Sequence, residues 1–124
     1  MRETRPLRVL LVDDSVDFAQ HVRDYLEFSG FEVAVAVGGL EGLALARRDR
    51  PDVVVTDLKM PGLSGWELVA ALQEDEHTPF IVVASGSGEF QAREEVEQAS
   101  GCSFLRKPFR LRDLERLLRE FAGE

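Results

Sequence analysis

The chain has 124 residues, of which 44% are hydrophobic and 31% charged, a composition typical of one folded domain and too apolar for intrinsic disorder. Its net charge of -8 argues against direct binding to nucleic acid or to an acidic membrane. No apolar stretch is long enough for a membrane span or a signal peptide, so we expect a single cytoplasmic domain over residues 1–124, with its core at about 7–122.

Short apolar runs alternate with longer amphipathic stretches, a pattern typical of βαβ units and a parallel sheet. Gly30 is placed to end the first helix and Ser64 to cap the third. Phe18 shares the apolar face of the first helix. In chain order we predict five pairs of a strand and a helix: 7–12 with 15–29, 31–37 with 40–48, 53–55 with 64–74, 80–84 with 89–99, and 102–105 with 111–121.

The apolar runs also predict the order of the strands. A strand buried on both faces reads as a continuous apolar run, whereas an edge strand alternates or is short. The runs at 7–12, 53–55 and 80–84 are continuous, the run at 31–37 alternates, and the run at 102–105 is brief. We therefore expect an α/β flavodoxin-like (βα)5 fold with a doubly wound parallel sheet, strand order 2-1-3-4-5, and helices on both faces.

Polar residues follow four of the predicted strands, at the edge where such sheets bind ligands. Each has an ordinary explanation by itself, because an aspartate often caps a helix or begins a turn. Their arrival at one edge from four strands indicates a shared site. They are Asp13 and Asp14 after the first strand, Asp57 after the third, Ser85 after the fourth, and Lys107 with Pro108 after the fifth.

Three carboxylates close together repel one another unless a cation neutralises them. Oxygen ligands without a histidine or cysteine favour a hard cation, so we expect Mg²⁺, or Mn²⁺ in its place. A carboxylate is also a competent nucleophile towards phosphorus, and Asp57 is the candidate. Lys107 would supply a second positive charge and Ser85 a hydrogen bond to the phosphoryl group.

The residues resemble, over essentially the whole chain, the receiver domains of response regulators in two-component signalling. The resemblance rests on four motifs in family order: Asp13-Asp14, the run at 57–62 with Gly65, Ser85-Gly86, and Lys107-Pro108-Phe109. It implies that Asp57 accepts a phosphoryl group from a histidine kinase or a histidine phosphotransfer protein. The implied domain is a signalling switch and not a turnover enzyme.

The resemblance also implies roles for the residues around Asp57. Mg²⁺ would be held by Asp14, Asp57 and the main-chain carbonyl of Lys59, with Asp13 acting through a water molecule. Lys107 would contact the phosphoryl group, and its peptide bond to Pro108 would be cis. Apart from the resemblance, the run Gly86-Ser87-Gly88 lacks the pattern of a P-loop and indicates mobility near the switch.

Ser85 and Phe104 resemble the switch pair of the family. The serine hydroxyl would move to the phosphoryl group and the ring would turn inward, which would change the face formed by the segments 89–99, 102–105 and 111–121. A downstream protein would read that face, since we expect no output domain in this chain.

A homodimer through the same face is a further expectation, because acidic residues in 89–99 could pair with arginines in the last strand and helix; the alternative is that both sets are solvated. The arginines are Arg106, Arg110, Arg112, Arg116 and Arg119.

Two other classes of protein share parts of this pattern. A phosphatase of the haloacid-dehalogenase type also forms an aspartyl phosphate, but it uses an Asp-x-Asp pattern after the first strand, where this chain has Asp13-Asp14-Ser15. A flavin carrier of the flavodoxin type shares the fold, but clustered carboxylates would repel the flavin phosphate. The sequence favours the receiver over both.

Overall fold

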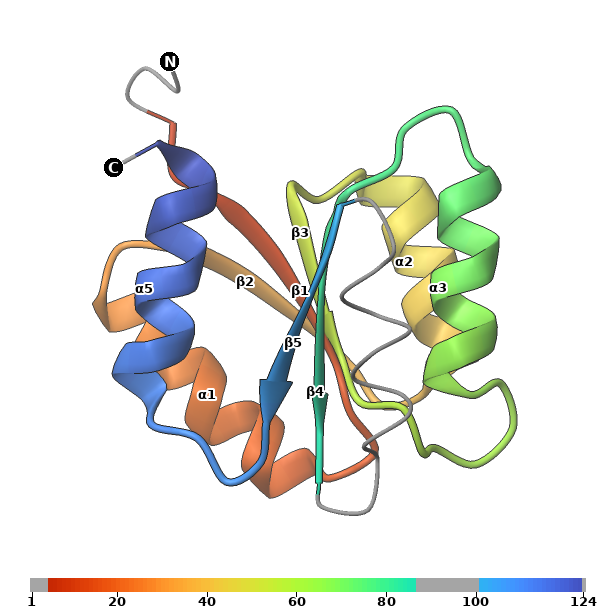
Figure 1. The fold of residues 1–124 in the computed structure, drawn as a ribbon, viewed down its shortest axis with the longest axis horizontal. Coiled ribbons are helices and arrows are strands. Elements are labelled where there is room, and N and C mark those ends of the chain that lie inside the picture. The colour runs from red at the N-terminus through yellow and green to blue at the C-terminus, as the bar shows by residue number, and fades with distance from the viewer. Residues whose placement is uncertain (1–4, 87–100, 124) are drawn as a thin grey trace.

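The computed structural model describes residues 5–86 and 101–123, so the helix predicted at 89–99 lies outside the described residues. The described residues form a five-stranded parallel sheet in the order β2-β1-β3-β4-β5 (Figure 1). This confirms the predicted α/β fold and strand order. The strands are β1 (Arg8–Val12), β2 (Glu32–Ala36), β3 (Val53–Thr56), β4 (Phe80–Ser85) and β5 (Cys102–Arg106).

The register of the strands brings their carboxyl ends level. Val12 at the end of β1 pairs with both Ala36 of β2 and Thr56 of β3, and Thr56 in turn pairs with Val83 of β4. Ser85 at the end of β4 pairs with Arg106 at the end of β5. Residues that directly follow these strands therefore lie at one edge of the sheet.

Helices cover both faces of the sheet, as Figure 1 shows, with α1 and α5 on one face and α2 and α3 on the other. The side chains of β1 alternate between them, because successive residues of a strand point to opposite faces. Leu10 and Val12 pack with α2 and α3, whereas Val9 and Leu11 pack with α1 and α5. The helices are α1 (Val16–Phe28), α2 (Gly39–Asp49), α3 (Gly65–Glu74) and α5 (Leu111–Ala122).

The ends of the described elements differ from the prediction by at most one residue. Ser64 is the N-cap of α3, as predicted, and forms a capping box with Glu67. The last strand residues Thr56, Ser85 and Arg106 are polar and still belong to the paired ladder. The prediction ended each strand at its last apolar residue, so it missed these positions. Within the described residues no helix is long and apolar enough to cross a membrane.

Candidate functional site

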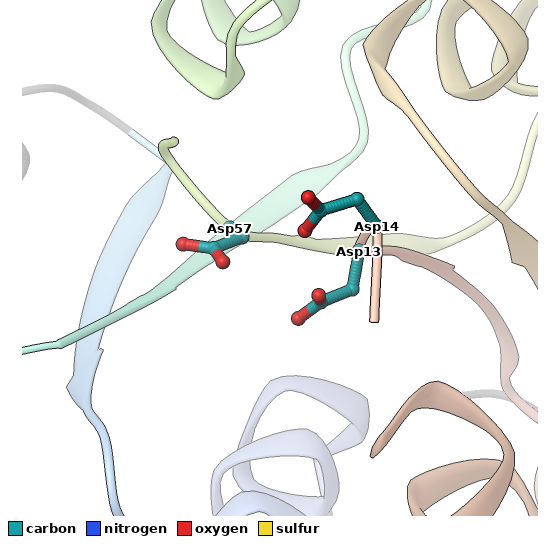
Figure 2. A group of neighbouring side chains, drawn as sticks. All are labelled: Asp13, Asp14 and Asp57. Carbon is teal, nitrogen blue, oxygen red and sulfur yellow. The ribbon is translucent and has the colours of Figure 1, made fainter. Parts of the chain in front are cut away.

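Three carboxylates meet at the carboxyl edge of the sheet. One oxygen from each of Asp13, Asp14 and Asp57 lies within 4.8 Å of the others, and Figure 2 shows that the side chains come from the ends of two neighbouring strands. Asp13 is buried, Asp57 is partly exposed and Asp14 is exposed. The predicted convergence of β1 and β3 thus produces a compact acidic group with one side open.

Lys107 supplies a positive charge to this group from the loop after β5. Its Nζ donates to Oδ2 of Asp13 at 2.8 Å and to Oδ2 of Asp57 at 3.3 Å. Burial by itself lowers the pKa of Lys107, but the hydrogen bonds and negative charges of Asp13 and Asp57 outweigh burial, so its pKa lies above the ordinary value. The side chain is therefore a cation at neutral pH.

Backbone amides orient two of the carboxylates. The amide of Ser15 donates to Oδ1 of Asp13 at 2.9 Å, and the amide of Leu58 donates to Oδ1 of Asp57 at 2.7 Å. Gly65, at the start of α3, lies so close to the backbone of Asp57 that a Cβ at that position would overlap the Asp57 carbonyl oxygen. Local backbone contacts thus set how Asp57 faces the site.

The other predicted site residues surround this group without all joining it. Ser85 is buried at the end of β4, and its carbonyl oxygen accepts a 2.7 Å hydrogen bond from the Lys107 amide. The Lys107–Pro108 peptide bond is cis. Phe104 lies half-buried against the apolar cluster of α2 and α3. Lys59 and Gly86 are exposed in the loops after β3 and β4.

Phe18 is a neighbour of the site that the sequence assigned only to the helix core. The Nζ of Lys107 lies 4.4 Å from the centroid of the Phe18 ring. Phe109 meets the same ring edge to face at 5.9 Å between centroids. The available signals were the place of Phe18 one helical turn after Asp14 and of Phe109 two residues after Lys107. Neither signal could show that the side chains meet.

The three aspartates fit a hard divalent cation. All of their donor atoms are carboxylate oxygens, the ligands that Mg²⁺ and Mn²⁺ prefer. Among the described residues, the group combines three carboxylates with the ammonium of Lys107, so carboxylates outnumber the cation. Asp14, the most exposed of the three, leaves the open side of the group accessible.

Comparison with known proteins gives a consistent set of relatives. The family description "Response regulator receiver domain" matches residues 9–119. Transcriptional regulatory protein PrrA of Mycobacterium tuberculosis is 39% identical over 107 residues, which are 86% of this chain and 46% of that protein. Response regulator MprA of Mycolicibacterium vanbaalenii is 36% identical over 109 residues, 88% of this chain and 47% of that protein. The chain spans about half the length of these relatives.

Solved structures with the same architecture include a response regulator receiver domain protein of Clostridium thermocellum, with a TM-score of 0.88 at 28% identity over 94% of both chains. The chemotaxis response regulator CheY4 of Vibrio cholerae has a TM-score of 0.84 at 32% identity, over 94% of this chain and 99% of its own. Together with the family match over residues 9–119, these likenesses show that the chain belongs to the receiver domains of two-component response regulators.

Proposed function

We propose that the chain is a phosphorylation switch in which Asp57 accepts a phosphoryl group from a phosphohistidine of a histidine kinase or a histidine phosphotransfer protein. The arrangement of Asp57 beside Lys107 and two further carboxylates carries this proposal. The Asp57 side chain is 18% exposed, compared with 8% for Asp13. Asp13 also holds Lys107 more closely, so Asp57 is the more accessible and the less tightly paired of the two carboxylates that contact Lys107.

The transfer step is a displacement at phosphorus. A carboxylate oxygen of Asp57 forms the new O–P bond while the N–P bond of the donor breaks. The imidazole nitrogen keeps the electron pair of the broken bond, and its other nitrogen carries the proton. Lys107, already within hydrogen-bond distance of Asp57, would neutralise negative charge on the phosphoryl oxygens.

A divalent cation belongs to the same proposal. Asp14, Asp57 and the main-chain carbonyl of Lys59 would hold it, with Asp13 acting through a water molecule. Mg²⁺, or Mn²⁺ in its place, would supply the charge that makes the negative phosphoryl group acceptable beside three carboxylates. The compact all-oxygen donor set and its excess negative charge support this part.

Ser85 and Phe104 would carry the signal away from Asp57. They lie on paired strands, since Val83 is opposite Phe104 and Ser85 is opposite Arg106. We expect the Ser85 hydroxyl to move to the phosphoryl group and the Phe104 ring to turn inward. Gly86 follows Ser85, and a Cβ at that position would meet open space.

The surface that would change includes β5 and α5, together with segment 89–99, which lies outside the described residues. A groove between β5 and α5 carries both charges and apolar atoms, from Phe104, Leu117, Asp113, Arg116 and Glu120. A downstream protein, or a second copy of this chain, would bind there. Light scattering before and after phosphorylation tests the homodimer, and an unchanged monomer mass would contradict it.

The prediction that Arg119 belongs to that surface is wrong. Its guanidinium donates to the Ser29 carbonyl at 2.8 Å and to Glu115, and it lies 4.9 Å from the centroid of the Phe31 ring. These partners lie on α5 itself and at the end of α1. The sequence could not separate Arg119 from the other arginines because helical spacing does not reveal which side of α5 meets α1.

The decisive experiment is to incubate the protein with Mg²⁺ and a small phosphodonor and to measure its intact mass. Acetyl phosphate serves as a general donor, and phosphoramidate provides the N–P bond of the proposed physiological donor. We expect one added phosphoryl group on the unaltered protein and none on Asp57→Asn. Omission of Mg²⁺ with EDTA present should prevent the reaction.

Asp75→Asn is the matched control, because Asp75 is an aspartate paired with Arg47 at the surface, away from the site. It should be labelled like the unaltered protein. Full labelling of Asp57→Asn would contradict the assignment of the acceptor. Loss of labelling with Asp13→Asn but not with Asp57→Asn would instead indicate the phosphatase type of chemistry.

A further inference from the structure

The ammonium of Lys107 has an aromatic partner in addition to its two carboxylates. We propose that Phe18 is a positioning residue that holds Lys107 in the site by a cation–π contact. This inference rests on the proposed role of Lys107 in phosphoryl transfer. The distance of 4.4 Å from Nζ to the ring centroid lies well within the roughly 6 Å over which such contacts act.

The donor capacity of the ammonium explains why a third partner matters. A lysine ammonium has three N–H donors and no acceptor. Two of them are used by Asp13 and Asp57, at 2.8 and 3.3 Å. The face of an aromatic ring carries partial negative charge, so Phe18 can receive the third donor where an aliphatic side chain could not. The three partners, Asp13, Asp57 and the Phe18 ring, together hold the amine in place.

The Phe18 ring is itself held in place. It lies on α1, shortly after the two aspartates that follow β1, and Phe109 packs its ring edge to face against it at an interplanar angle of 84°. Both rings line a small cavity that also touches Asp13 and Asp57. Phe109 follows Lys107 closely in the chain, so the pair of rings joins α1 to the lysine loop beside this cavity.

A merely space-filling role for Phe18 makes a different prediction. Leucine would fill much of the same volume but would offer no negative face to the ammonium. Tyrosine would keep the face. The comparison of Phe18→Leu with Phe18→Tyr therefore separates the cation–π contact from packing.

Side-chain NMR of labelled lysine reads the contact directly, because the chain has two lysines, Lys59 and Lys107. The Lys107 methylene protons next to the amine should be shifted upfield by the ring, whereas those of exposed Lys59 should not. We expect Phe18→Leu to remove this shift and Phe18→Tyr to retain it. This readout needs no phosphorylation, so it tests the contact even if the proposed function fails.

The rate of labelling by acetyl phosphate with Mg²⁺ gives the second readout. Phe18→Leu should slow it about 3- to 10-fold, the loss expected when a partly buried cation–π contact no longer keeps the amine in place. Phe18→Tyr should restore most of the rate. Phe80→Leu is the matched control, because Phe80 is a partly buried ring that stacks on Phe121 at the other end of β4.

Two results would overturn the inference. One is an unshifted Lys107 signal in the unaltered protein. The other is a labelling rate that falls equally in Phe18→Leu and Phe18→Tyr, because packing alone would then explain the effect. Circular dichroism melts of each variant show whether loss of the fold contributes.

Discussion

The backbone carbonyl and the side-chain carboxylate of Asp57 each accept a hydrogen bond from a neighbouring residue. The Thr56 hydroxyl donates to the Asp57 carbonyl at 2.8 Å, and the Leu58 amide donates to the Asp57 carboxylate. Gly65 lies against the same carbonyl and donates its amide to the Leu58 carbonyl at 2.9 Å. At the scale of single residues, the site thus depends on a close backbone approach that only glycine permits.

Gly65→Ala should destabilise the fold and disturb Asp57 together. Its Cβ would overlap backbone atoms of Asp57 and Leu58, which cannot rotate away as a side chain could. We expect a loss of about 2 to 4 kcal/mol in the free energy of unfolding by urea. Gly86→Ala is the control, because its Cβ would meet open space, and a similar loss in both variants would contradict the explanation.

At the scale of elements, α1 and α3 begin in different ways. Ser64 accepts a hydrogen bond from the Glu67 amide at the start of α3, and the Glu67 carboxylate accepts one from the Ser64 amide. Ser15 occupies the same position of α1 without a side-chain cap, and its backbone amide donates to Asp13. The start of α1 therefore orients the Asp13 carboxylate of the site, whereas the start of α3 is stabilised by its own capping box.

These two serines give a matched pair of substitutions. Ser64→Ala should lower the free energy of unfolding by about 1 kcal/mol, because it leaves an amide of the first turn without its acceptor. Ser15→Ala should change it little. Thermal or urea unfolding measures the free energy of unfolding of both variants. An equal effect of the two substitutions would contradict a stabilising role of the capping box.

Helices α1 and α5 are linked by polar contacts although they lie far apart in the sequence. The Tyr25 hydroxyl donates to Glu115 at 2.8 Å, and Arg119 joins Glu115 to the Ser29 carbonyl. The Tyr25 hydrogen bond is the largest cause that lowers the pKa of Glu115, and the same bond raises the pKa of Tyr25. The bond requires an ionised Glu115 and a protonated Tyr25.

The stability that this bond contributes should therefore depend on pH in two directions. Glu115 has a lowered pKa, so its part is complete above the ordinary value of 4.5 and is lost as pH falls through the lowered pKa. Tyr25 has a raised pKa, so its part is complete below 10.0 and is lost as pH rises through the raised pKa. A double-mutant cycle with Tyr25→Phe and Glu115→Gln should show coupling at pH 7 that disappears at both extremes. Coupling that is independent of pH would contradict the assignment.

At the scale of the whole molecule, one sheet separates two apolar clusters, and the acidic group lies at its carboxyl edge. The clusters hold the strand ends level, which keeps three carboxylates together against their repulsion. The net charge of -8 adds a general attraction for cations. Folding energy therefore maintains a cluster that a bound cation should stabilise further.

Mg²⁺ should accordingly raise the melting temperature. At a concentration about ten times the Kd, binding to the folded state alone adds about 1.4 kcal/mol, or roughly 3 to 6 °C for a domain of this size. Calorimetry in Mg²⁺ and in EDTA measures the shift. Asp14→Asn should reduce it strongly, because it removes one carboxylate of the group, and an equal shift in that variant would exclude these aspartates as the site.

The order of the strands and the edge at which the polar residues gather both follow from local patterns in the chain. Continuous apolar runs identify the central strands, and parallel strands necessarily end at one edge, so Asp13, Asp14, Asp57 and Lys107 could be predicted as neighbours. These inferences need only the periodicity of side chains and the direction of the chain, which are local properties.

Tertiary structure alone decided how these neighbours meet. Lys107 lies closer to Asp13 than to Asp57, the Phe18 ring lies beneath its amine, and Arg119 faces α1. Each contact joins segments that are distant in the sequence. The distance between the contacting atoms depends on how the loops and helices between those segments pack. Periodicity assigns a residue to a face or an edge, but only packing determines which atom of that residue touches which partner.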